Sequence, residues 1–462
     1  MKNVRVKPAF VLLVLSLSAG CASYRPAPIH PGENLSRFES RTLGNPALEE
    51  FVRRNSPGAI PRWPPRKWDL ALLTASAFYY HPDLDVARAR WGVAKAAVIT
   101  AGQRPNPGVG VVPEYNANSA SGISPWILGF SLDIPLETAG RRGYRIARAG
   151  DLSRAARFHV AAAAWRVRSR LRKRLLDLFA AVRTETILER RQTVQGEIVE
   201  ATEKRLAAGE ISRLEVTRAR ISRDRTVLLL REARKRIAEA RVAVADAVGV
   251  PAAALEGIDI SFPFPDGFPA NPPSGEVRRE ALLNRPDILA SLAEYEASQS
   301  SLRLEISRQY PDLRLGPGYK WDQGDNKWSL GFSVSLPVFH HNQGPIAEAE
   351  ARRTESAARF TALQARVIGE SDRALAGYRE SLGKLDAADT LLASQRARRK
   401  SEEALFNAGE ADRLAFLGAR LEMEAGELAR LESLVEAQKA LGLLEDAVER
   451  PLVPAEEFPS TP

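Results

Sequence analysis

Few residues of this chain have the types and spacing that covalent or metal chemistry requires. The sequence holds one cysteine, Cys21, which excludes an intramolecular disulfide and a zinc site built on cysteines. Adjacent residues do not share a helix face, and the pair His340-His341 has no nearby Asp or Cys, so metal binding is not expected there. The sequence also lacks the G-x-S-x-G, phosphate-loop and H-E-x-x-H motifs. We therefore expect no enzyme activity, no catalytic residue and no metal site.

Cys21 follows what reads as an export signal. A basic start leads into an apolar run over 10–17, which is too short to cross a membrane as a helix. The five residues ending at Cys21, Leu-Ser-Ala-Gly-Cys, resemble the bacterial lipobox, although Ser18 stands where leucine is usual. We expect a lipoprotein signal peptide over 1–20, a covalent lipid on Cys21 and no other cofactor. Ala22, in place of aspartate, indicates the outer membrane of a Gram-negative-type bacterium. An ordinary secretory signal with an incidental cysteine is the alternative.

The positive charge of the chain raises the question of nucleic acid. The formal net charge is +9, and loss of a signal peptide with three basic and no acidic residues leaves +6. An arginine-rich run over 166–174 would suit phosphates in isolation. It lies, however, within a long stretch of helical periodicity, where such a run usually forms a solvated face. An exported, weakly basic protein is not expected to bind nucleic acid.

The two halves of the chain repeat each other at an offset of 200 to 204 residues. The segment 81–84, H-P-D-L, matches 285–288, R-P-D-I. The motif A-G-E-x-x-R-L begins at Ala208 and again at Ala408. The expected organisation is a signal peptide at 1–20, an extended Pro-rich segment at 21–67, a first repeat at 68–258, a Pro-rich linker at 259–275, a second repeat at 276–450 and a tail at 451–462.

Each half contains two short segments with strand character. In the segment 126–134, apolar residues alternate with small or polar ones, which places the two kinds on opposite faces of a strand. Tryptophan and tyrosine lie near the strand ends, as in the aromatic girdles of membrane barrels, with a soluble hairpin as the alternative. The expected strands are 108–115 and 126–134, then 313–321 and 327–336, with a turn at 322–326 and a proline, Pro135 or Pro337, ending each second strand.

Long helical hairpins follow the strands. The stretch 139–207 holds no proline, and Val167, Leu171, Leu175 and Leu178 form an apolar stripe. A helix of ~65 residues is roughly 100 Å long, which does not fit a compact domain and implies a coiled-coil-like assembly. The expected hairpins cover 139–248, reversing at Gly209, and 345–447, reversing at Gly409.

Four strands per chain are too few to close a barrel, and a membrane permits no open sheet edge. Three chains would supply twelve strands to one closed barrel, and their helices would pool into a hollow cylinder. The expected fold is therefore mainly α with a small β part. It is a tandem repeat of helix–strand–strand–helix–helix that forms a trimeric transmembrane β-barrel continued by a long periplasmic α-helical barrel.

These features resemble the TolC-like outer-membrane factors, the trimeric exit ducts of tripartite efflux pumps and type I secretion. The resemblance covers about 68–450. Residues 339–344, F-H-H-N-Q-G, resemble a family segment, while 104–107, R-P-N-P, and 136–142, L-E-T-A-G-R-R, resemble the branch that serves heavy-metal cation pumps. The resemblance implies a homotrimer in outer-membrane lipid, with a periplasmic adaptor and an inner-membrane pump as partners. Such a duct would passively conduct heavy-metal cations or small toxic compounds to the exterior.

The resemblance also implies where the adaptor binds. In the family, the two hairpin turns form the periplasmic entrance and meet the adaptor, where glycine permits the chain reversal. A purely structural turn with a solvated face is the alternative. The residues so assigned are Gly209, Glu210, Ser212, Arg213, Leu214, Gly409, Glu410, Asp412, Arg413 and Leu414.

An acidic ring narrows the entrance of some family members, on the sixth residue after the turn glycine. That position is Glu215 in the first half but Ala415 in the second, so the ring is half present. Glu210, Glu410 and Asp412 are the further candidates for the constriction, because acidic rings favour cations.

Two other functions remain open at this point. One is the outer-membrane duct of type I protein secretion, which operon neighbours would distinguish. The other is a non-channel periplasmic coiled-coil scaffold lipoprotein. The scaffold does not explain why two aromatic-rich hairpins occupy equivalent places in the repeats.

Overall fold

The computed structural model describes residues 22–55, 62–262, 264, 267–269 and 272–452. The signal peptide, Cys21 and most of the C-terminal tail lie outside these residues. The chain divides into two units, Met1–Thr42 and Leu43–Pro462, and the second holds both repeats.

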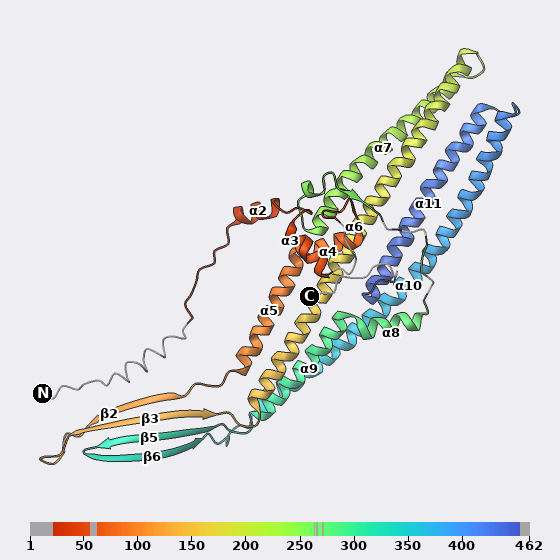
Figure 1. Cartoon of the computed structure of the whole chain (residues 1–462). Helices are drawn as coiled ribbons and strands as arrows, with labels where there is room; N and C mark the ends of the chain where they lie inside the picture. The colour runs from red at the N-terminus through yellow and green to blue at the C-terminus, as the bar shows by residue number, and fades with distance from the viewer. Residues whose placement is uncertain (1–21, 56–61, 263, 265–266, 270–271, 453–462) are drawn as a thin grey trace. The chain divides into compact units, whose positions relative to one another are not determined.

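The element order of the second unit confirms the tandem repeat (Figure 1). In the first repeat the order is α4 (Leu70–Tyr80), α5 (Pro82–Gly102), β2 (Gly108–Tyr115), β3 (Trp126–Leu136), α6 (Arg141–Ala207) and α7 (Arg213–Val248). In the second it is α8 (Ser274–Asn284), α9 (Pro286–Ser307), β5 (Leu313–Asp322), β6 (Asp325–Val334), α10 (Gln343–Asn407) and α11 (Arg413–Val448). The short turn η1 (Ala252–Leu255) and strand β4 (Asp259–Ile260) connect the repeats, and β4 pairs in parallel with β1 (Lys67–Trp68).

The N-terminal segment is not extended throughout, contrary to expectation. It contains α2 (Pro31–Glu39) in the first unit and α3 (Pro46–Asn55) in the second. Both helices begin with proline, which suits the first helical position because the N–H it lacks would have no partner there. Leu48 and Val52 of α3 are buried in the core.

The strand ends also differ from expectation. Strand β3 continues through Pro135 to Leu136, because its pairing with β2 stops at Asp133 and proline is tolerated where one side of a strand is open. Strand β6 runs from Asp325 to Val334, so it begins earlier and ends three residues before Pro337. The turn before β6 is shorter than predicted, since only Gln323 and Gly324 separate the paired ends, both with positive φ.

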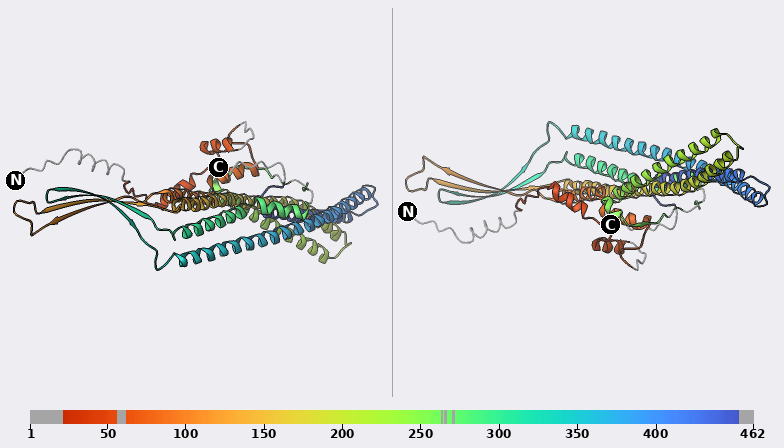
Figure 2. Two further views of the ribbon diagram at one scale, coloured as in Figure 1. Left: turned by 90° about the horizontal axis from the view of Figure 1, so that it is seen from below. Right: turned by 90° about the horizontal axis from the view of Figure 1, so that it is seen from above.

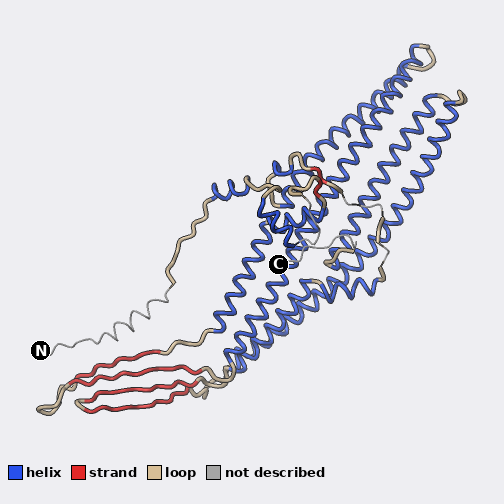
Figure 3. The backbone as a smooth tube through the Cα atoms, in the orientation of Figure 1, coloured by secondary structure: helices blue, strands red, loops and turns tan. Residues whose placement is uncertain are grey.

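The helices of the second unit pack lengthwise, and both views of Figure 2 show this. Helix α6, of 67 residues, contacts α4, α5 and α7 of its own repeat and α9 and α11 of the other. The predicted stripe of Leu171, Leu175 and Leu178 lies in the main apolar core, together with Leu70 and Leu73 of α4. Within this unit, the four strands lie at one end of the long helices and the two hairpin turns at the other (Figure 3).

Among the residues that the structure describes, none of the helices combines the length and apolar composition needed to cross a membrane.

Candidate functional site

The four long strands form one antiparallel sheet in the order β2-β3-β5-β6. Directly paired residues share a face, and the register places Phe130 opposite both Val111 and Tyr319, and Trp328 opposite Tyr319. This face is apolar on all four strands and exposed, with Phe332 76% and Trp328 81% accessible. The apolar face is formed by Val109, Val111, Pro113, Tyr115, Trp126, Leu128, Phe130, Leu132, Ile134, Leu136, Leu313, Leu315, Pro317, Tyr319, Trp321, Trp328, Leu330, Phe332 and Val334.

The opposite face of the sheet is mostly small and polar, with Val112 and Ile127 as apolar exceptions. Glycines and serines lie there among charged residues that pair across strands. Arg314 bonds Asp133 of β3 at 2.9 Å, and Lys320 of β5 lies 3.3 Å from Glu114 of β2. The alternation predicted for 126–134 is thus confirmed and extends over the whole sheet.

The sheet has two open edges. Neither the outer side of β2 nor that of β6 pairs with another strand within the described part of the chain. Open edges are templates for pairing with another chain, and an apolar sheet face this exposed marks an interaction surface.

The two hairpin turns have the same geometry. Gly209 and Gly409 both adopt φ of 77°, the left-handed region that favours glycine. The next residue closes each helix end, since the N–H of Glu210 donates to the carbonyl of Arg205 and that of Glu410 to the carbonyl of Leu405, each at 2.9 Å. The predicted reversals at these glycines are confirmed, whereas the adaptor-binding role of the turn residues stays a prediction.

The structure brings some of the predicted entrance acids together and not others. Arg205, near the end of α6, pairs with Asp412 of the second turn and lies 3.8 Å from Glu210 of the first. One cation thus ties the two turns and compensates part of the charge of both acids. Glu215, on the first turn of α7, is exposed and forms no part of this contact.

Comparison with known proteins decides the family. Residues 75–250 and 277–446, which include both repeats, match the outer membrane efflux protein family. The chain belongs to this family. Its members are transport ducts of the outer membrane of Gram-negative-type bacteria, which is where this chain resides, and they are not a family of enzymes.

Individual proteins that are similar to this chain agree with the family assignment. The cobalt-zinc-cadmium resistance protein CzcC of Cupriavidus metallidurans is 29% identical over 264 residues, which are 56% of this chain and 59% of CzcC. The chain thus matches less than two thirds of that relative. Two solved structures share the fold, each at 18% identity. VceC of Vibrio cholerae has a TM-score of 0.66 over 83% of this chain and 97% of its own. CusC has a TM-score of 0.65 over 86% and 96%.

An ionic cluster inside this efflux protein contradicts the expected solvated face of the arginine run. Arg168 and Arg172 are buried, and both lie beside Glu445 of α11, at 3.3 and 3.5 Å. Arg172 also donates to the backbone carbonyl and the side chain of Gln438. Arg166, Arg170, Lys173 and Arg174 are exposed, as expected.

Asp446 extends this cluster. It accepts hydrogen bonds from the Trp165 indole at 2.9 Å and the Ser169 hydroxyl at 2.7 Å. Burial raises the pKa of the Asp446 carboxyl, and these two hydrogen bonds oppose the rise. Helical spacing could have revealed the cluster, because Arg168 and Arg172 fall on the stripe of Leu171 and Leu175.

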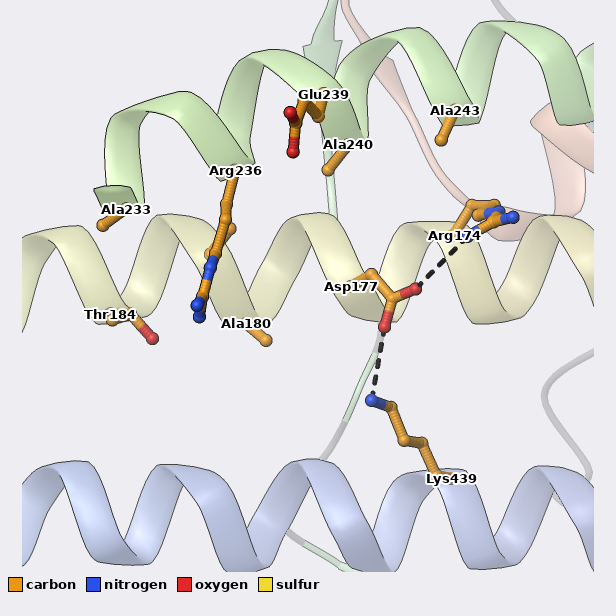
Figure 4. A pocket seen from close by; sticks show the side chains of 11 residues that line it. Arg174, Asp177, Ala180, Thr184, Ala233, Arg236, Glu239, Ala240, Ala243 and Lys439 are labelled. Atoms are coloured by element: carbon orange, nitrogen blue, oxygen red, sulfur yellow. Dashed lines mark ion pairs between the residues drawn. The ribbon is translucent and has the colours of Figure 1, made fainter. Parts of the chain in front are cut away.

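A cavity of about 390 Å³ lies between α6, α7 and α11 (Figure 4). Asp177 reaches toward Lys439 of α11 at 3.3 Å and toward Arg174 at 3.9 Å, while alanines including Ala180 and Ala240 line the wall. These ion pairs compensate charge at the cavity rim, and we assign the cavity no ligand.

Two left-handed glycines allow a matched test of the helix ends. Gly249, at φ 86°, ends α7 with the backbone of Tyr80 and His81 only 3.0 Å from the place of a Cβ, whereas Gly209 has no atom within 4 Å of that place. We expect Gly249→Ala to lower the free energy of unfolding by about 2 kcal/mol or more, and Gly209→Ala by about 1 kcal/mol. Urea unfolding followed by circular dichroism measures both. Equal losses would contradict the tight packing at Gly249.

Proposed function

We propose that this chain is the outer-membrane exit duct of a tripartite efflux system and passively conducts substrates from the periplasm to the exterior. The observation that carries the proposal is the four-stranded sheet, with one apolar face, one polar face with cross-strand ion pairs, and two open edges. A wall that separates lipid from a wet lumen needs these two faces. Its open edges require further strands, because a bilayer offers the backbone no hydrogen-bond partner.

The helices support closure by copies of the same chain. Helix α6 of the first repeat packs against α9 and α11 of the second. By the symmetry of the repeats, α10, the counterpart of α6, should pack against α5 and α7. The extensive contacts of α10 among the described residues are instead with α8, α9 and α11. The surface of α10 therefore fits α5 and α7 of a second copy.

Side-chain exposure agrees with this arrangement. Leu428 of α11 packs against the cluster that includes Leu188 of α6, whereas its counterpart on α7, Leu228, is 70% exposed. Ala290 of α9 is buried, whereas its counterpart on α5, Val86, is 51% exposed. Side chains that are covered by other helices in the second repeat thus have exposed counterparts in the first repeat. Three copies would bring the strand number to twelve, and we propose a homotrimer.

The partners follow from the passive nature of a duct. A conduit without a catalytic site needs an energised inner-membrane pump and a periplasmic adaptor, and the exposed hairpin turns are the surface that we assign to the adaptor. The lipid on Cys21 would add an anchor to the outer membrane. The similarity to a cobalt-zinc-cadmium resistance protein makes heavy-metal cations the first substrate class to test.

Growth of a deletion strain, with and without the intact gene, tests this function. We expect selective sensitivity to zinc, cobalt or cadmium, restored by the wild-type chain. Broad sensitivity to dyes, detergents and antibiotics would contradict the assignment of metals as the substrate but would still support an efflux duct. Altered secreted proteins with normal growth in both panels would favour type I secretion.

A further inference from the structure

The second hairpin joins the rest of its repeat at a junction of four helices. Arg285, in the turn between α8 and α9, is buried there. It donates to both carboxylate oxygens of Asp287 at 3.0 and 2.7 Å and to Glu370 of α10 at 3.3 Å. It also donates to the backbone carbonyl of Ala447 in the last turn of α11, at 3.0 Å. One guanidinium thus connects the end of α11 to α9 and α10.

Glu449 lies directly after α11 and faces this arginine. Its backbone is left-handed, with φ of 48°, which is uncommon for a residue other than glycine. Its side chain is 10% exposed, and Oε1 lies 4.0 Å from the Arg285 guanidinium. Its other oxygen, Oε2, accepts no hydrogen bond from the described residues. The carboxyl group of Glu449 is therefore largely shielded from water, and its charge is only weakly compensated by Arg285.

The first repeat shows that the fold does not require this carboxylate. Two hundred residues earlier, Gly249 ends α7 in the same left-handed conformation. His81 occupies the place of Arg285, and Arg170 of α6 lies 3.2 Å from its ring. The turn geometry alone is satisfied by glycine, so Glu449 adds an ionisable group to one hairpin only.

The charges around Glu449 come from each helix that meets there. Two cations, Arg285 and Arg166 of α6, favour its ionised form, and the carboxylates of Asp287 and Asp446 oppose it. Glu370 of α10 adds a further carboxylate at Arg285, and Arg366 lies 4.0 Å from Glu370. Burial, with Asp287 next in effect, raises the pKa of Glu449 to about 7.

We propose that this junction is a proton-operated hinge at the base of the second hairpin, with Glu449 as the group that changes charge. Protonated Glu449 is neutral and tolerates burial. Once it loses its proton, a further negative charge sits beside Asp287 and Asp446, and exposure of the last turn of α11 to water relieves both repulsion and desolvation.

The direction of the pH effect follows from the raised pKa. A carboxyl whose pKa is higher in the folded than in the unfolded chain stabilises the fold at low pH. This contribution is complete below about 4.5, the unfolded value, and is lost as the pH rises through about 7. The junction is therefore tightest in mild acid and loosens above neutrality.

Hydrogen exchange of the full-length protein in detergent between pH 6 and 8.5 tests the hinge, after correction for intrinsic exchange. In the wild type, the equilibrium constant for opening of the backbone amides in peptides 440–452 and 274–290 should be roughly tenfold larger at the upper pH. Glu449→Gln, and Glu449→Gly as the residue of the first repeat, should abolish that dependence. The matching peptide 240–250 of the first repeat is the control and should not open more at the upper pH, because burial lowers the pKa of His81 and this shift favours the folded junction as the pH rises. A wild type without pH dependence, or the same dependence in both variants, would overturn the hinge; neither result bears on the duct.

Discussion

Glu445→Gln is expected to destabilise the helical part of the protein by about 3–5 kcal/mol. Glu445 lies 2% exposed in α11, and its carboxylate is shared by the buried guanidinium groups of Arg168 and Arg172. It also accepts from the backbone N–H of Leu452 at 3.1 Å. Removing its charge takes away a carboxylate that both buried arginines share, and breaking such a pair costs far more than forming it gains.

The matched control for this substitution is Glu436→Gln on the same helix. Glu436 pairs with Lys384 of α10, but both side chains are more than half exposed, so the loss should stay below about 1 kcal/mol. Urea unfolding followed by circular dichroism compares the two variants. Similar losses for both would show that the buried cluster contributes no more than a surface pair.

Leu228→Asp is expected to prevent assembly while leaving the single chain folded. In one chain this side chain is 70% exposed on α7 and contributes little to the core. In the proposed ring it packs against α10 of the next copy, where a carboxylate would lose its water without gaining a counter-ion, at a cost of several kcal/mol. Light scattering of the purified protein in detergent should give three chains for the wild type and one for the variant.

The neighbouring leucine provides the control for Leu228. Leu229 is 52% exposed and points about 100° away around the helix, so we expect it to lie outside the proposed interface with α10. Leu229→Asp should therefore keep the wild-type mass. Loss of assembly in both variants, or in neither, would contradict the assignment of the interface to this face of α7.

Periodicity predicted most of the architecture, because each half repeats both the alternation of its strands and the apolar stripe of its long helix. Side chains such as Trp126 and Phe130 reveal a strand face because the period of two needs no knowledge of the partner strand. The residues of the two turns were also found by sequence, since only glycine adopts their left-handed conformation without strain.

The features that sequence reasoning missed depend on distant partners. Charge and helical periodicity predict a solvated face for the run 166–174, yet Arg168 and Arg172 are buried because α11 brings Glu445 to them from about 275 residues away. Helix α3 was missed in a segment rich in proline, since the core that buries Leu48 and Val52 comes from later elements. The left-handed backbone of Glu449 could not be predicted from its residue type, because glutamate rarely adopts this conformation. Only its counterpart Gly249 carries the residue that is typical of such a helix end.

The central claim is that copies of this chain close into a ring of three. The most direct measurement is cross-linking of a double variant, Leu228→Cys on α7 with Leu391→Cys on α10, using a short bismaleimide. Leu391 is 49% exposed, and at the offset of 200 residues that the two turn motifs keep it lies three residues beyond the counterpart of Leu188, nearly one turn further along the same side of the helix. Because α7 and α10 make no extensive contact with each other within one chain, only neighbouring copies should be joined. A denaturing gel should show dimers and trimers and nothing larger, with neither single variant giving this series. Monomers alone, or a series that continues beyond three chains, would contradict the ring.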